Sequence, residues 1–136
     1  MRIKVPYSLL PGINVDILMP MSPIIYRNSK YEFPTFALVD SGATGAIIST
    51  VIADALCINW QKIPKKTGLS TAGSFIFHQT EIEVEIYDHS FSLPVSIVEG
   101  ISPFKCILGQ ADLFQKAKIT FERYNNEFEI DFRSLN

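Results

Sequence analysis

The sequence predicts one mostly-β domain with one or two short helices. Three observations indicate this fold class. Apolar and polar residues alternate with period two along much of the chain, two segments have the pattern of a β-hairpin, and only one stretch has convincing helical spacing. The arrangement that we expect is a small barrel or a folded sheet. At 136 residues, with 47% hydrophobic and 19% charged residues, the chain can bury one core, so we expect a single domain over 1–136.

The strands are predicted from the alternation, taken in chain order. Residues 13–19 begin with alternation, and 31–39 end as a continuous apolar run. The clearest case is 80–98, where isoleucines and a valine alternate with three glutamates, and where the apolar pattern resumes after a polar interruption. Asp88-His89 stands at that interruption, where a tight turn belongs, so 80–98 is predicted to be a long hairpin.

A second hairpin and the helices complete the predicted elements. Residues 118–132 read as two strands around an Asn-Asn pair, which tolerates positive φ in a turn. Residues 49–58 are predicted to be helical, with Ser49 or Thr50 as the N-cap. A further helical turn is predicted within 110–117. The apolar face of the first helix is expected to consist of Val51, Ile52, Ala55 and Leu56.

Composition and charge exclude several classes of protein. Twelve basic and fourteen acidic residues leave a net charge of −2, and without a basic stripe we expect no nucleic-acid partner. No apolar run approaches the ~18 residues of a membrane helix, and prolines and an aspartate interrupt any signal-like core near the N-terminus. We therefore expect no membrane partner and a cytoplasmic location. The two cysteines and two histidines are scattered, so no metal site is expected.

The segment 37–46, ALVDSGATGA, places an acidic residue at the end of an apolar run and surrounds it with small side chains. Asp40 here has two interpretations. It ends a strand in an Asx-turn for which Gly42 supplies the turn, or it is a reactive carboxylate that a rigid strand holds in a partly dry place. In the second case Gly42 leaves space for a close approach, and Ser41 and Thr44 offer hydroxyls to the carboxylate or to nearby backbone.

A second segment, CILGQADLF at 106–114, combines an apolar run, a glycine and a short amphipathic turn. Together the two segments, Asp-Ser-Gly-Ala-Thr early and Ile-Leu-Gly-x-x-Asp-Leu-Phe late, resemble the retropepsin-like aspartic proteases, over about Ile13 to Phe132. The resemblance implies the retropepsin-like closed barrel, mostly β with one or two short helices and one lobe per chain. It also favours the catalytic interpretation of Asp40. In that family the glycine of the later strand allows its backbone to pack beside the catalytic loop.

The resemblance implies roles for individual residues. The catalytic motif would be Asp40, Ser41 and Gly42, and the residues that support it Ala43, Thr44, Leu108 and Gly109. A hairpin called the flap is expected over 70–77, with its tip at Thr71, Ala72 and Gly73. Substrate-binding side chains are expected at that tip and at Phe75, Ile76, Phe104 and Ile107. The chain departs from the family pattern in having serine where threonine is commonest, and one flap glycine rather than several.

Hydrolysis by this chemistry needs two carboxylates around one water, and the sequence contains a single Asp-Ser-Gly motif. A working site therefore requires two copies of Asp40 at a two-fold axis. We expect an aspartic endopeptidase that is a homodimer, uses no cofactor and acts on a peptide or unfolded protein, with 127–132 as an interface strand. The alternative is a non-catalytic dimeric peptide-binding or dimerisation module on the same fold.

Three other functions fit the sequence less well. A phosphate-binding loop at SGATGA lacks the Gly-Lys-Ser/Thr and Gly-x-Gly-x-x-Gly patterns. A nucleophilic Ser41 would need His78 or His89 beside it, and both histidines are expected to be solvated residues of strands. An unrelated β-barrel that binds a small ligand would be a monomer with Asp40 far from any second copy.

Overall fold

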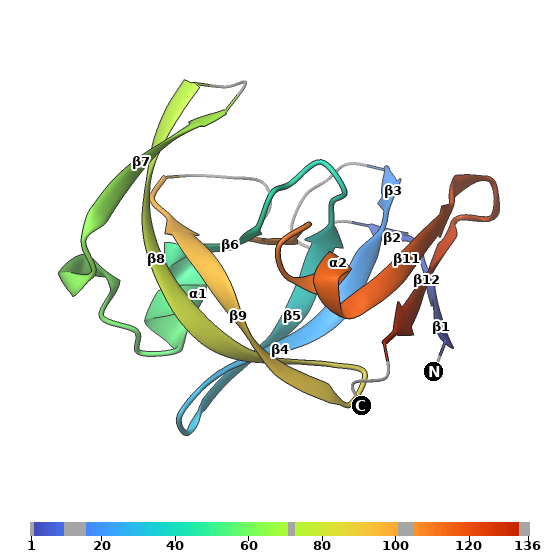
Figure 1. The fold of residues 1–136 in the computed structure, drawn as a ribbon, viewed down its shortest axis with the longest axis horizontal. Helices are drawn as coiled ribbons and strands as arrows, with labels where there is room; N and C mark the ends of the chain where they lie inside the picture. Colours follow the sequence, from blue (N-terminus) through green and yellow to red (C-terminus); the bar gives the residue numbers. More distant parts are fainter. Residues whose placement is uncertain (1, 10–15, 71–72, 101–104, 134–136) are drawn as a thin grey trace.

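The computed structural model describes residues 2–9, 16–70, 73–100 and 105–133 (Figure 1). The largest sheet contains β4 (Met21–Asn28), β5 (Tyr31–Val39), β6 (Ala46–Ser49), β7 (Lys65–Ser70), β8 (Gly73–Ile86), β9 (His89–Val98) and β10 (Cys106–Leu108). Two smaller sheets contain β1 (Arg2–Pro6), β11 (Ala117–Glu122) and β12 (Glu127–Phe132), and β2 (Ser8–Leu9) with β3 (Leu18–Met19). The helical elements are α1 (Thr50–Ala55), α2 (Leu113–Lys116), and the 3₁₀ turns η1 (Trp60–Lys62) and η2 (Arg123–Asn125).

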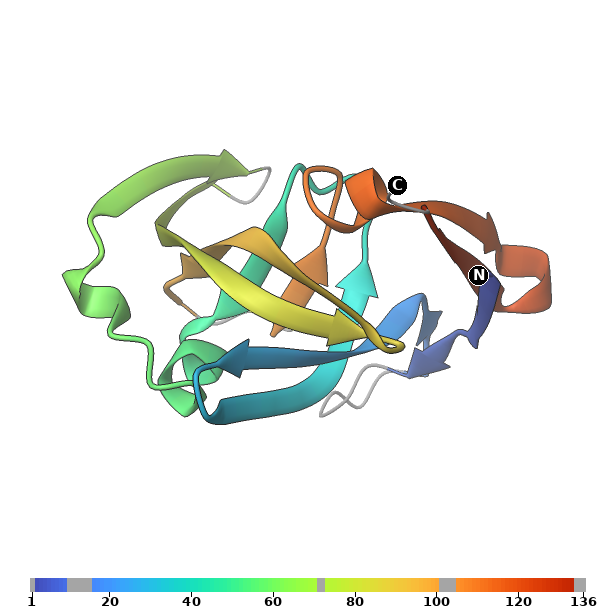
Figure 2. The ribbon, with the colours of Figure 1, turned by 60° about the horizontal axis from the view of Figure 1, so that its bottom comes forward.

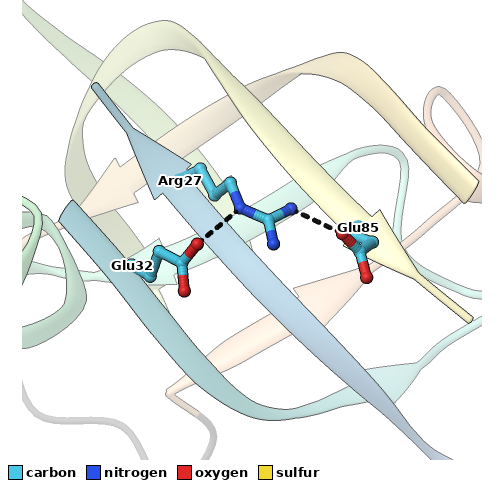
Figure 3. A network of polar contacts seen from close by, with 3 residues as sticks. All are labelled: Arg27, Glu32 and Glu85. Atoms are coloured by element: carbon cyan, nitrogen blue, oxygen red, sulfur yellow. Dashed lines mark hydrogen bonds and ion pairs between the residues drawn. The ribbon is translucent and has the colours of Figure 1, made fainter. Parts of the chain in front are cut away.

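The largest sheet closes on itself into a ring of strands. Its order is β4-β5-β10-β6-β9-β8-β7, and β4 pairs in addition with β8, from Ile25↔Glu85 to Arg27↔Glu83. Arg27 reinforces this closure from β4 (Figure 3): its Nε donates to Glu32 Oε1 of β5 at 2.9 Å and its Nη1 to Glu85 Oε1 of β8 at 2.8 Å. One side chain thus ties three neighbouring strands together where the ring closes.

The ring encloses the core. Apolar residues of β4, β5, β6, β8 and β9 point inward, and α1 packs its buried Ile52, Ala53 and Leu56 onto them. The largest fully buried side chains include Tyr26, Ile48, Ile52, Leu56, Ile86, Leu93, Ile97 and Leu108. In the described part of the chain no helix has the length and hydrophobicity to span a membrane.

The three-stranded sheet lies at one end of the molecule and strand β7 at the other (Figures 1 and 2). In the small sheet β12 is the central strand, paired antiparallel with β1 on one side and with β11 on the other. The predicted 118–132 hairpin is confirmed, and Asn126 has the positive φ, 52°, that its turn requires.

Two sequence-based details are wrong. The turn of the β8–β9 hairpin is Tyr87-Asp88, with φ of 45° and 67°, and not Asp88-His89. Two consecutive positive φ values match the twist of a two-residue hairpin, and His89 begins β9. In α1, Val51 and Ala55 of the predicted apolar face are both exposed, Val51 at 57%, and Ala53 takes the buried position beside Ile52. The short helix presents 52, 53 and 56 to the ring because its axis is set by packing, which the spacing alone does not fix.

Two parallel pairings bring the motif segments together. β10 lies between β5, with which it runs parallel from Ile107↔Leu38 to Leu108↔Val39, and β6. β6 in turn runs parallel to β9. Because β5 and β10 end side by side, the loop after β5 (residues 40–45) lies next to the segment after β10 (residues 109–112).

Candidate active site

The loop that carries Asp40 is held at both ends by the ring. Ala37, Leu38 and Val39 at the end of β5 are buried, and the half-buried Asp40 follows directly. The Asp40 N–H donates to Leu108 O of β10 at 2.9 Å, and the Ala43 N–H donates to Asp40 O at 3.2 Å. The backbone of Asp40 is therefore fixed by a neighbouring strand as well as by its own turn.

The carboxylate of Asp40 is oriented by backbone. The Gly42 N–H donates to Asp40 Oδ1 at 2.8 Å, and a hydrogen bond of this kind fixes the orientation of the carboxylate. This N–H, rather than the hydroxyl of Ser41 or Thr44, holds the carboxylate, and both of those residues are exposed. Ser41 and Thr44 are thus on the surface of the loop, where another molecule can reach them.

The segment after β10 (residues 109–112) makes four contacts with the Asp40 loop (residues 40–45). Gln110 N–H donates to Ala43 O and Ala111 N–H to Thr44 O, each at 2.9 Å, and the Gln110 side-chain Nε2 donates to Ser41 O at 2.7 Å. The fourth contact is steric: a Cβ on Gly109 would lie 2.5 Å from Ala43 O. Glycine at 109 is therefore required for the two backbones to approach this closely.

Asp112 supports the same segment, a role that was not predicted from the sequence. It is 2% exposed and is the N-cap of α2, where its Oδ1 accepts from Gly109 N–H at 2.9 Å and from Leu113 N–H at 2.5 Å. Burial raises the pKa of this carboxyl, and the backbone hydrogen bonds oppose the rise. The N-cap rule, an Asp immediately before a short amphipathic turn, could have identified it.

A hollow separates the Asp40 loop from the β7–β8 hairpin. It is lined by residues 42–45 of the loop, by β6 and β9, and by β7 and β8, including Phe75 and Phe77, whose ring centroids lie 5.6 Å apart. The ring of Phe75 packs over Gly68 of β7, where a Cβ would lie 2.5 Å from the ring. A β-hairpin is thus present in the segment where the flap was expected, and Phe75 and Phe77 on it line the same hollow as residues 42–45 of the Asp40 loop.

The other residues expected to bind substrate are placed less uniformly. Gly73 begins β8 with a φ of +118°, whereas Thr71 and Ala72 lie outside the described residues, as does Phe104. Ile107 pairs with Leu38 and Ile47 within the ring and is half-buried. Ile76 is 39% exposed and does not line the hollow.

A second hollow adjoins Asp40, and no described residue of the β7–β8 hairpin lines it. Asp40 and Ser41 line it together with Met19, Pro20, Leu38, Val39 and, from β11, Phe121. Phe121 is 38% exposed, and its ring is tilted by 33° against those of Phe114 and Phe128, with centroid distances of 6.5 and 6.1 Å. The Asp40-Ser41 pair therefore faces a shallow apolar surface that the small sheet helps to build.

His78 pairs with Lys65 at the base of the β7–β8 hairpin, and the expectation of a solvated histidine is wrong. It is 0% exposed, its Nδ1 lies 2.7 Å from Ile63 O, and its Nε2 lies 2.7 Å from Glu99 Oε2. Both partners accept hydrogen bonds, so this geometry suits the doubly protonated imidazolium. The hydrogen bond to Glu99, followed by that to the Ile63 carbonyl, raises the pKa of His78, against burial and the nearby Lys65.

A retropepsin-like fold combines three features that this chain has. They are the ring of strands, the contact between segments 40–45 and 109–112, and the β7–β8 hairpin next to them. The chain has this fold, as the sequence predicted, and comparison with solved structures agrees. A retropepsin-like aspartic protease from Rickettsia conorii superposes with a TM-score of 0.69 at 13% identity, covering 97% of this chain and 91% of that one. The EIAV protease, complexed with the inhibitor HBY-793, gives a TM-score of 0.54 at 16% identity, with 76% of this chain and 92% of that one covered.

Comparison at the level of sequence finds no such likeness. No protein-family model matches the chain, and no curated protein matches it. The similarity therefore lies in the fold, and the function has to be argued from the site itself.

Proposed function

We propose that this protein is an aspartic endopeptidase, active as a homodimer, that hydrolyses peptide bonds with a water activated by two Asp40 carboxylates, one from each chain. The observation that carries the proposal is the position of Asp40: half-buried at the end of a buried strand, oriented by the Gly42 N–H, and next to a hollow below a β-hairpin. The likeness of the fold to two proteases supports it.

The chemistry follows from two carboxyl groups that share one proton. Two carboxyl groups about 3 Å apart cannot both ionise. One of them therefore carries the proton and the other is charged, and their titration belongs to the pair. The ionised group takes a proton from the water, whose oxygen attacks the carbonyl carbon of the peptide. The protonated group donates a hydrogen bond to the carbonyl oxygen, and the proton gained by the first group then passes to the leaving amine as the C–N bond breaks.

The second carboxylate has to come from a second copy. The sequence holds one Asp-Ser-Gly motif, and no other aspartate is followed by Ser/Thr-Gly. An isologous dimer presents the same patch from both copies and so brings two identical loops to its axis. In this proposal Ser41 and Gly42 complete the catalytic motif, and Ala43, Thr44, Leu108 and Gly109 hold it in place.

The substrate would be an extended segment of peptide or unfolded protein between the Asp40 loop and the β7–β8 hairpin. A strand-like segment can hydrogen-bond with the flap tip at Thr71, Ala72 and Gly73, as an added β-strand does. The aromatic lining at Phe75 favours apolar side chains next to the cleaved bond. Phe104 and Ile107 remain candidate contacts.

The test compares the protein with Asp40→Asn and with Asp88→Asn as a matched control. Asp88 lies in the β8–β9 turn at a φ of 67°, which asparagine tolerates, so the control changes one charge and leaves the site intact. Incubation with an unfolded protein between about pH 4 and 7 should give cleavage by the parent and by Asp88→Asn, and none by Asp40→Asn. If none of the three cleaves but peptide still binds, the protein is a non-catalytic peptide-binding module.

A further inference from the structure

We propose that the second copy of this chain binds along the outer edge of β11, so that the two β11 strands pair antiparallel and join the two small sheets into one. This inference rests on the proposed function, because that function needs a second Asp40. It identifies the surface that brings the second copy, which the proposed function leaves open.

The pairing within the small sheet leaves two edges for a partner strand. β12 is hydrogen-bonded along both sides, to β1 over five residue pairs and to β11 over six. Both edges of the strand expected at the interface, 127–132, are therefore occupied within its own chain, so a partner strand could pair with it only by displacing β1 or β11. Among the described strands, the outer edges of this sheet belong to β1 and β11.

Of the two outer edges, that of β11 is the better candidate for binding the second copy, because β11 lies closer to Asp40. Phe121 of β11 lines the same hollow as Asp40 and Ser41, together with Pro20 and Leu38. A partner that covers this hollow buries a 38%-exposed aromatic ring and at the same time approaches the Asp40 loop. In Figure 1 β11 lies between α2 and the rest of the small sheet, whereas β1 lies at the far side of it.

The charges of β11 are complementary to their own two-fold image. When two copies pair antiparallel with Thr120 opposite Thr120, Lys118 of each copy faces Glu122 of the other, and Ile119 faces Phe121. The interface would therefore contain two opposite-charge pairs and two apolar pairs. Glu122 is already oriented, because the Tyr124 hydroxyl donates to its Oε2 at 2.8 Å.

The edge of β1 lacks this property. Its charged residues are Arg2 and Lys4, whose side chains are 75% and 69% exposed. Each lies near an acidic residue of β12, Asp131 at 3.7 Å and Glu127 at 4.0 Å. Self-pairing of β1 would bring cations of the two copies together, and exposed lysine or arginine on an edge strand opposes such pairing.

The test reverses the two charges separately and together. Lys118→Glu places two glutamate pairs across the axis, and Glu122→Lys places two lysine pairs there. Each variant alone should raise the dimer dissociation constant on the order of tenfold or more, measured by sedimentation equilibrium. Because a mixture of the two variants restores both opposite-charge pairs in a heterodimer, the mixture should associate as tightly as the parent, as should the chain carrying both reversals.

A second pair of variants tests the apolar contact. Phe121→Asp should dissociate the dimer, whereas Tyr31→Asp, an aromatic residue with 37% exposure on another strand, should leave it unchanged. Circular dichroism spectra confirm that each variant is folded before it is compared. Dimers of Lys118→Glu and Glu122→Lys as tight as the parent's, a mixture that fails to recover, or a parent that sediments as a monomer at its highest soluble concentration would each overturn the proposal.

Peptidase assays on the same samples separate this inference from the proposed function. If the mixture of variants forms the dimer, and neither the mixture nor the parent cleaves peptide, the result supports the interface and contradicts the enzyme. If the parent cleaves peptide but no β11 substitution changes the dimer dissociation constant, the result supports the enzyme and contradicts the interface.

Discussion

Replacing Gly109 with alanine tests how closely the two segments of the candidate active site are packed. The new Cβ would lie 2.5 Å from Ala43 O and 3.0 Å from Ala43 C and Cβ, whereas ordinary contacts begin at 3.4 Å. The loop and the segment must therefore separate by about 0.9 Å at this point. The obstacle is backbone on both sides, so no side chain can rotate away to make room.

The expected cost follows from that displacement. Overpacking of this kind costs about 1–3 kcal/mol, and the Gln110 N–H···O Ala43 bond, 2.9 Å long, would stretch with a further loss of about 1 kcal/mol. A total of about 2–4 kcal/mol lowers the Tm of a chain of this size by roughly 10 °C. Because Asp40 lies on the displaced loop, the peptide cleavage that we propose for this protein should fall as well.

Gly45→Ala is the matched control, since a Cβ at Gly45 meets nothing within 4 Å although it lies on the same loop. Thermal unfolding followed by circular dichroism should leave this control within about 0.5 kcal/mol of the parent. A Gly109→Ala protein that unfolds at the same temperature as Gly45→Ala would show that the steric argument is wrong.

Three further substitutions test the electrostatics of the site. In the proposed dimer, Asp40→Asn should keep the fold and the association, because two close carboxyls then no longer have to share a proton; a collapse of its thermal transition would contradict this. Asp112→Ala should lower the free energy of unfolding by about 1–3 kcal/mol in urea titrations, since it leaves the Gly109 and Leu113 N–H groups without their acceptor. Asp112→Asn keeps that acceptor and should be nearly neutral. His78 has a folded-state pKa above its ordinary 6.5, so its stabilising contribution is complete below about pH 6.5 and is lost as the pH rises through the folded value. The difference in free energy of unfolding between the parent and His78→Gln, measured in urea across that range, should therefore decline with rising pH. A difference that stays constant would show that His78 is not an imidazolium in the folded protein.

The alternation of apolar residues predicted much of the fold because the ring has one buried face. In 80–98, Ile82, Val84 and Ile86 are all buried, as the pattern required. The two motif segments also met as expected, with Gly109 against Ala43. These features depend on local pattern or on a resemblance carried by few residues.

The features that the sequence did not predict depend on long-range packing. His78 has the alternation of any strand residue, and its burial results from η1 folding back so that Ile63 O meets the ring. The central place of β12 likewise results from β1, more than a hundred residues earlier, pairing with it from Arg2↔Asp131 to Pro6↔Glu127. Single-sequence periodicity contains no information on such partners.

The parallel pairing of β5 with β10 has a consequence for how the protein is made. Leu38 meets Ile107 only after nearly seventy intervening residues have been synthesised, and the amide of Asp40 waits for Leu108 in the same way. Pairing of strands that are so far apart in sequence is slow, because the chain loses conformational entropy before the stabilising contacts form. A nascent chain therefore carries an unassembled Asp40 loop until Cys106–Leu108 has been synthesised.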